Sequence, residues 1–125
     1  MITVGFGAAR GVTADELLAA VDAVLPPDAG AVRLASLAAR AAEPGPIAAA
    51  ARREWPLTGY SAAELAAVAV PAPSARVAEL TGTPSVAEAA ALVEGGRLVV
   101  GKTVLGRVTV AVSAGPREGS PNLQG

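Results

Sequence analysis

Hydrophobic and polar positions along the chain switch between the period of a strand and the period of a helix. A β-rich run over residues 2–6 ends in glycine and predicts a first strand. Apolar residues then recur at helical spacing, which predicts a helix that opens at Thr13 and ends at two prolines after Leu25. Thr13 and Glu16 have the spacing of a capping box, in which each side chain satisfies the other residue's backbone N–H.

The same alternation continues along most of the chain and closes with a pair of strands. We expect strands over residues 31–37 and 57–60, helices over 44–55, 61–68, 74–80 and 85–94, and final strands over 98–100 and 107–112. The loop 101–106 between the last two is short, so these strands are expected to be antiparallel. The pattern predicts an α/β domain of three layers, α/β/α, with a mixed, mostly parallel sheet that ends in an antiparallel hairpin. Residues 1–114 form this single domain, and the polar, Gly- and Pro-rich residues 115–125 are expected to be a disordered tail.

Composition excludes several classes of chemistry. The 125 residues contain no Cys and no His, which excludes a disulfide scaffold, a thiolate nucleophile, a Ser-His-Asp triad and the usual zinc sites. A net charge of −1 and 2% aromatic residues give no sign of a nucleic-acid partner. No apolar run is long enough to span a membrane and no signal peptide precedes the first strand, so we expect a cytoplasmic protein. We expect no metal and no cofactor, and the residues alone identify no catalytic group.

The turn after the first strand is the first candidate for a binding site. Gly5, Gly7 and Gly11 would let the backbone approach a ligand closely, and Arg10 adds a forked donor. The helix N-terminus at Thr13 favours an anion, so a carboxylate or a phosphate is one hypothesis. The other is a tight strand-to-helix turn that simply needs glycine.

Two further positions carry charges that could serve a site. Lys102 is the only lysine in the chain and follows the strand 98–100, where it could bind an anion, act as an amine nucleophile, or be a solvated turn residue. Glu43 precedes Pro44 and could be a functional carboxylate or a negative charge near a helix N-terminus. Arg40, three residues earlier, could pair with Glu43.

Ser85 and Glu88 have the spacing of another capping box, which explains both residues structurally. The helix that they open follows the rigid turn at Pro84, so its N-terminus is a second possible anion site.

The order of these motifs resembles the CobE / CbiG C-terminal domain family of cobalamin biosynthesis. The resemblance covers about residues 2–113. Its matching pieces are the glycine-rich stretch 4–12, Leu34-Ala35-Ser36, Arg40 with Glu43-Pro44-Gly45, residues 60–65, Val70-Pro71, residues 82–92, Leu98-Val99-Val100 with Lys102, and residues 108–111. The chain departs from the family pattern at Ala8, where the family often has Cys, and at Arg40, where it often has Lys. A thiol role at the first loop is therefore excluded.

The resemblance implies a role in assembling the corrin ring, in the family's stand-alone form. Its ligand would be a precorrin-type tetrapyrrole, whose many acetate and propionate groups suit Arg10, Arg40 and Lys102. We expect this site at the carboxyl ends of the strands, with Glu43 orienting a cation or carrying a proton and with Ser85 and Glu88 shaping the wall.

Three functional hypotheses follow. The first is a carrier or accessory protein that binds a precorrin intermediate. The second is an enzyme that acts on a ring substituent, for example a hydrolase that opens a lactone, as the family's fused members do. The third is a domain that docks onto another cobalamin-pathway enzyme. The absence of His and Cys favours binding over catalysis.

Overall fold

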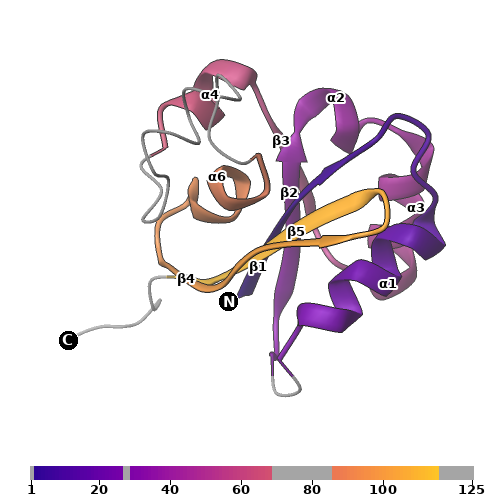
Figure 1. The fold of residues 1–125 in the computed structure, drawn as a ribbon, viewed down its shortest axis with the longest axis horizontal. Coiled ribbons are helices and arrows are strands. Elements are labelled where there is room, and N and C mark those ends of the chain that lie inside the picture. The colour runs from indigo at the N-terminus through magenta and orange to yellow at the C-terminus, as the bar shows by residue number, and fades with distance from the viewer. Residues whose placement is uncertain (1, 27–28, 69–85, 116–125) are drawn as a thin grey trace.

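In the computed structural model, which describes residues 2–26, 29–68 and 86–115, the strands form one mixed sheet (Figure 1). The strands are β1 (Ile2–Ala8), β2 (Val32–Leu37), β3 (Leu57–Tyr60), β4 (Arg97–Leu105) and β5 (Val108–Ala114). They lie in the order β3-β2-β1-β5-β4. Strands β1, β2 and β3 pair in parallel, and β5 is antiparallel to both β1 and β4. The predicted mixed sheet with a closing antiparallel hairpin is confirmed.

Helices cover both faces of this sheet. They are α1 (Ala14–Val24), α2 (Ala38–Ala41), α3 (Pro44–Arg53), α4 (Ala62–Ala66) and α6 (Val86–Leu92). Helices α1 and α3 pack on one face, and α4 and α6 lie on the other, so the predicted α/β/α layers are confirmed (Figure 1). The predicted helix over residues 74–80, Ser85 and the tail from residue 116 lie outside the described residues.

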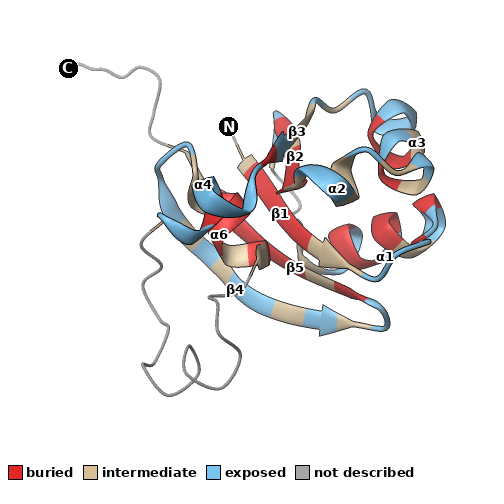
Figure 2. Cartoon of the chain, turned by 90° about the horizontal axis from the view of Figure 1, so that it is seen from above, coloured by how far each residue is buried: buried red, intermediate tan, exposed pale blue. Residues whose placement is uncertain are grey.

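The two faces of the sheet are built from side chains of different size. Towards α1 and α3 the strands bury large groups such as Val4, Phe6 and Leu34. Towards α6 the strands present small residues, namely Gly5, Ala35 and Ala111. The side of α6 that packs on them is also built of alanines: Ala87, Ala89, Ala90 and Ala91. Figure 2 shows buried residues along β1 and β5 and on the sides of α1 and α6 that face the sheet, whereas α4 is mostly exposed. Because the side chains on both sides of this contact are small, α6 can lie closer to the sheet than a helix with large side chains could.

The start of α1 follows the sequence prediction. Thr13 Oγ1 accepts a hydrogen bond from Glu16 N at 3.0 Å, and Glu16 Oε1 accepts one from Thr13 N at 2.9 Å. The capping box is therefore formed. An ion pair between Arg53 and Asp22, at 2.8 Å, ties α3 to α1 across the same layer.

The final hairpin corrects the sequence prediction. The residues 101–106 were expected to form a loop, but β4 continues through Leu105 and the turn contains only Gly106 and Arg107. Gly106 has φ of +62°, which a two-residue hairpin turn requires. Gly101 does not end the strand; it lies where the register of the β4–β5 pairing shifts, between Val100 and Thr103.

The short helix α2 was not predicted. It begins directly after β2 and packs beside β3, where Gly59 leaves the room that it needs. A Cβ at Gly59 would lie 2.9 Å from Ala38 Cα. The helix has only four residues, too few for a periodic pattern to stand out in an alanine-rich stretch. It carries Arg40 to the end of the sheet where β1, β2 and β3 end, which we call the carboxyl edge.

Candidate functional site

The loop after β1 is held by a carboxylate from a distant part of the chain. Glu43 Oε1 accepts a hydrogen bond from Gly11 N at 2.9 Å, across 32 residues of sequence. Its other oxygen, Oε2, forms an ion pair with Arg40. Gly11 has φ of +85°, a conformation that favours glycine. The structure thus brings Gly11, Arg40 and Glu43 together at the carboxyl edge.

Glu43 does not cap the helix that it precedes. It is the N-cap residue of α3, but its side chain accepts no hydrogen bond from that helix. The predicted pairing with Arg40 is confirmed. Glu43 therefore orients the Arg40 guanidinium and the loop together, since each of its oxygens has a different partner.

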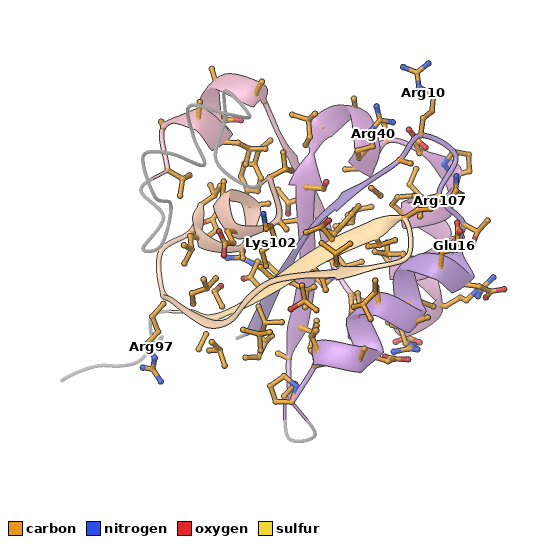
Figure 3. All side chains as sticks on the ribbon, in the orientation of Figure 1. Arg10, Glu16, Arg40, Arg97, Lys102 and Arg107 are labelled. Carbon is orange, nitrogen blue, oxygen red and sulfur yellow. The ribbon has the colours of Figure 1, made fainter. Side chains whose placement is uncertain are left out.

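The N-terminus of α1, which was expected to favour an external anion, is occupied by the protein's own carboxylate. Glu16 accepts from Thr13 N and also pairs with Arg107, at 2.7 Å between Nη2 and Oε1 (Figure 3). Arg107 donates to Gly11 O as well, at 3.3 Å. The hydrogen bond from Arg107, followed by the one from Thr13, lowers the pKa of Glu16 to about 2. Glu16 is therefore an anion throughout the neutral range.

Gly5 allows the close packing of α6, whereas α6 would leave room for a side chain at Gly7. A Cβ at Gly5 would lie 2.5 Å from Ala91 N and closer still to the carbonyl oxygen of Ala87. Gly5 is buried beneath α6, so helix packing accounts for the glycine, and its contact with a ligand stays a prediction. Gly7 is partly exposed, and a Cβ there would meet Val86 at an ordinary 3.6 Å. The close approach that Gly5 allows is made by α6, which follows it by about 80 residues in the sequence.

Lys102 lies within β4 rather than in the hairpin turn, which corrects its predicted placement. Its backbone N–H donates to Glu88 Oε2 of α6 at 3.0 Å. The lysine itself is exposed, and Figure 3 draws it beside α6. Neighbouring Thr103 pairs with Val110, which in turn pairs with Phe6, so Lys102 lies near the level of Phe6 and two strands away from β1.

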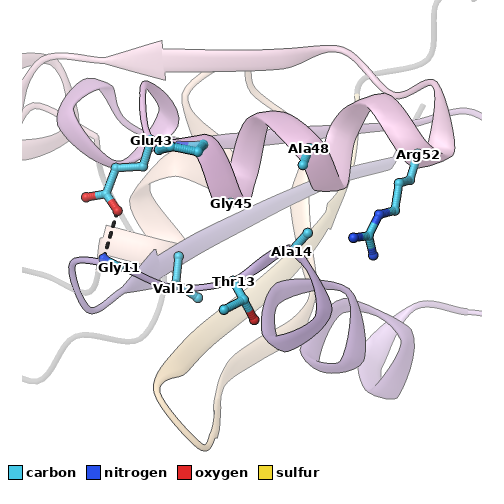
Figure 4. A pocket seen from close by; sticks show the side chains of 9 residues that line it. Gly11, Val12, Thr13, Ala14, Glu43, Gly45, Ala48 and Arg52 are labelled. Carbon is cyan, nitrogen blue, oxygen red and sulfur yellow. Dashed lines mark hydrogen bonds between the residues drawn. The ribbon is translucent and has the colours of Figure 1, made fainter.

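The three predicted cations form a spread arrangement rather than a closed cluster. Arg10 points outward from the loop after β1, and Arg40 lies below it on α2 (Figure 3). Lys102 lies on the far side of β1 and β5, next to α6. A groove of about 400 Å³ runs between the start of α1 and α3, and includes Gly11 and Glu43 but none of these cations (Figure 4). Ser85 lies outside the described residues.

The sequence reasoning missed several polar contacts because their partners are far apart in the chain. Arg107 and Glu16 are separated by 91 residues. Tyr60 Oη donates to Glu94 Oε2 at 2.8 Å beneath α6, and burial, together with this hydrogen bond, raises the pKa of Tyr60 to about 12. Nothing in the local pattern around either residue signals its partner.

Among the described residues, no three or more acidic, His or Cys side chains form a group that could hold a metal ion. Within the same part of the chain, no helix has the length and apolar character that crossing a membrane requires.

Comparison with known proteins places this fold among proteins of one pathway. Residues 2–113 match the family model described as cobalamin synthesis G C-terminus. A Sinorhizobium protein named Protein CobE is 42% identical, over 92% of this chain and 80% of its own length. This comparison and the family model together cover nearly all of the described sheet.

Two solved structures share the fold. The crystal structure of CobE, described as a protein from the cobalamin (vitamin B12) biosynthetic pathway, is 31% identical with a TM-score of 0.72, over 90% of this chain and 92% of the other. The crystal structure of the cobalamin biosynthesis protein chiG from Agrobacterium tumefaciens is 30% identical with a TM-score of 0.68, over 94% of this chain and all of the other.

Proposed function

This chain belongs to the cobalamin synthesis G C-terminus family, and from that premise we propose that it binds a precorrin-type tetrapyrrole at the carboxyl edge of its sheet. Its role would be that of a carrier or accessory protein in cobalamin biosynthesis. Arg10 and Arg40 at this edge hold carboxylates of the ligand, Glu43 fixes the direction of Arg40, and Lys102, on β4 beside α6, holds a more distant carboxylate. The family match over almost the whole described sheet is the observation that carries the proposal.

The spread of the cations supports a large ligand with many acids over a small anion. Precorrins carry acetate and propionate groups around the rim of a macrocycle, so their carboxylates are themselves far apart. A phosphate or a single carboxylate would instead need donors that converge on one point. Arg10 and Lys102 are exposed, and neither side chain bonds to another described residue, which leaves both available to a ligand.

The pairing of the acidic side chains supports binding rather than turnover. A general base needs a pKa near the working pH and a free oxygen. Glu16 is bound to Arg107 with a pKa of about 2, and Glu43 is bound on both oxygens. The chain also contains no His and no Cys. The groups at this edge therefore suit the recognition of acids better than the movement of protons.

A binding titration tests this function. We expect the absorbance of a purified precorrin intermediate to shift as it saturates the protein at one-to-one stoichiometry, with no change in its mass. Exposed ion pairs contribute about 0.2–1 kcal/mol, so Arg10→Ala and Lys102→Ala should each weaken binding by a factor of about 1.4 to 5. Added salt should weaken binding further, because exposed charges are screened.

Arg97 provides the matched control. It is an exposed cation on β4, like Lys102, but it pairs with Ala114, which in turn pairs with Ile2 at the opposite end of the sheet. Arg97→Ala should leave the affinity unchanged. Equal losses in Arg97→Ala and Lys102→Ala would mean that only overall charge matters. A folded protein that binds no precorrin would overturn the proposal, and a mass change at catalytic protein concentrations would identify an enzyme instead.

A further inference from the structure

Strand β4 is longer than the strand with which it pairs. Leu98 pairs with Ser113, Val100 with Val112 and Thr103 with Val110. The register therefore shifts twice, once between residues 98 and 100 and once between 100 and 103, and each shift gives β4 one extra residue. Nine residues of β4 thus lie opposite seven of β5. Extra residues of this kind are β-bulges, which redirect side chains and leave backbone groups without a ladder partner.

Lys102 lies in the second bulge, and side chains satisfy the backbone there. Glu88 Oε2 accepts from Lys102 N at 3.0 Å, and Thr103 Oγ1 donates to Gly101 O at 2.9 Å. The position that a Cβ of Gly101 would take lies 3.6 Å from the same oxygen of Glu88, so the carboxylate sits directly against the bulge. A carboxylate from α6 thus accepts the backbone N–H of a residue in the irregular part of β4.

The bulge determines the side of the sheet on which Lys102 lies. Val100 packs with the core beneath α1 and α3. In a regular strand, residues 100 and 102 would point to the same face, so Lys102 would extend on the α1 side. Figure 3 instead draws Lys102 beside α6. The extra residue between 100 and 103 accounts for this change of direction.

We propose that Glu88 is a positioning residue, which holds the bulge in β4 and thereby presents the Lys102 ammonium on the α6 side of the sheet. This inference rests on the proposed function, in which Lys102 binds a carboxylate of the tetrapyrrole. It differs from the expectation that Glu88 contacts the ligand as part of the wall. The carboxylate acts through the backbone of Lys102 and needs no contact with the ligand.

The first test needs no ligand. Because Lys102 is the only lysine, labelling the protein with ¹⁵N-lysine produces a single backbone amide signal. In Glu88→Ala this amide loses a charge-assisted hydrogen bond, and we expect its signal to move and its hydrogen exchange to become about tenfold faster. Glu88→Gln retains an oxygen acceptor and should stay near the wild type. Glu94→Ala, a control in the turn that follows the same helix, removes the partner of Tyr60 and should leave the Lys102 amide unchanged.

An unchanged Lys102 amide in Glu88→Ala would overturn the inference. So would equal changes in Glu88→Ala and Glu94→Ala, because they would report a general loosening of α6. Either outcome is obtained without ligand and leaves the proposed function standing.

The second test couples the two residues through binding of the precorrin. If Glu88 acts by positioning Lys102, Glu88→Ala and Lys102→Ala should each weaken binding by the same factor of about 1.4 to 5, and the double variant should bind no more weakly than Lys102→Ala. Independent, multiplying losses would mean that Glu88 touches the ligand, which overturns the inference. Wild-type affinity in Lys102→Ala would remove Lys102 from the proposed site, while the amide signal still decides whether Glu88 holds the bulge.

Discussion

Replacing Gly5 by alanine tests the close approach of α6 to the sheet. The new Cβ would lie 2.5 Å from Ala91 N and nearer to the carbonyl oxygen of Ala87. Both are backbone atoms, so no side chain can rotate away. Ordinary contacts need about 3.5 Å, so α6 would have to retreat by at least about 1 Å.

Such a retreat weakens the packing of the whole helix. A gap of that width forfeits roughly a quarter to a half of the dispersion energy of each contact that it opens. The contacts at risk belong to the four buried alanines of α6, Ala87, Ala89, Ala90 and Ala91. Overpacked cores lose about 1–3 kcal/mol, and the backbone contacts here place Gly5→Ala near the upper end, at about 3 kcal/mol.

Gly7→Ala is the matched control, because it makes the same change two residues along β1. Its Cβ would meet Val86 at 3.6 Å, so we expect a cost below about 1 kcal/mol. Urea unfolding followed by circular dichroism and by the single tryptophan gives both free energies. Similar stability of the two variants, within about 0.5 kcal/mol, would refute the reasoning from close approach. Gly5→Ala that folds normally but loses precorrin binding would support the ligand hypothesis for this glycine.

Three further outcomes follow from particular contacts. The pKa of Glu16 is lowered from 4.5 to about 2, so the contribution of its carboxylate to stability is complete above pH 4.5 and disappears as the pH falls towards 2. Between pH 5 and pH 2.5 the Tm of the wild type should therefore drop more than the Tm of Glu16→Gln. Tyr60 is the only tyrosine in the sequence, and its pKa is raised from 10.0 to about 12. The tyrosinate absorbance should therefore rise with a midpoint near pH 12, and the stability of the protein should decrease from pH 10 upwards. A midpoint near pH 10 would contradict the burial of Tyr60 beneath α6. Gly45→Ala places a Cβ against the carbonyl group of Val12, and we expect a loss of about 2–3 kcal/mol in the same urea assay, whereas wild-type stability would mean that α3 can shift away from the loop.

The order and type of most elements could be predicted from the sequence, because they depend on local chemistry. The capping box at Thr13 and Glu16 formed as its spacing predicted, since both partners lie within one helical turn. The strand at 57–60 and the helix at Pro44 also begin where the pattern indicated. Helix α2 escaped prediction because alanines carry no hydrophobic contrast.

The candidate site could be predicted only in part. Arg40 and Glu43 lie three residues apart, so their pairing was within reach of the local pattern. The second partner of Glu43, the backbone N–H of Gly11, is 32 residues away, so no local pattern could predict it. The bulge at Lys102 was likewise missed, because a run of strand-forming residues does not reveal how many residues the opposite strand supplies.

The sequence by itself determined most of the helices and strands, apart from α2 and the second half of β4, and it contains no Cys and no His. Tertiary structure decided what the glycines and the charges do. Gly5 lets α6 pack closely on the sheet, and Glu43 binds the backbone of the loop after β1. A bulge in β4 places Lys102 on the α6 side of the sheet. The physical reason is range: hydrogen-bonded caps and periodic faces act within a few residues, whereas close packing and strand register depend on which distant segments meet.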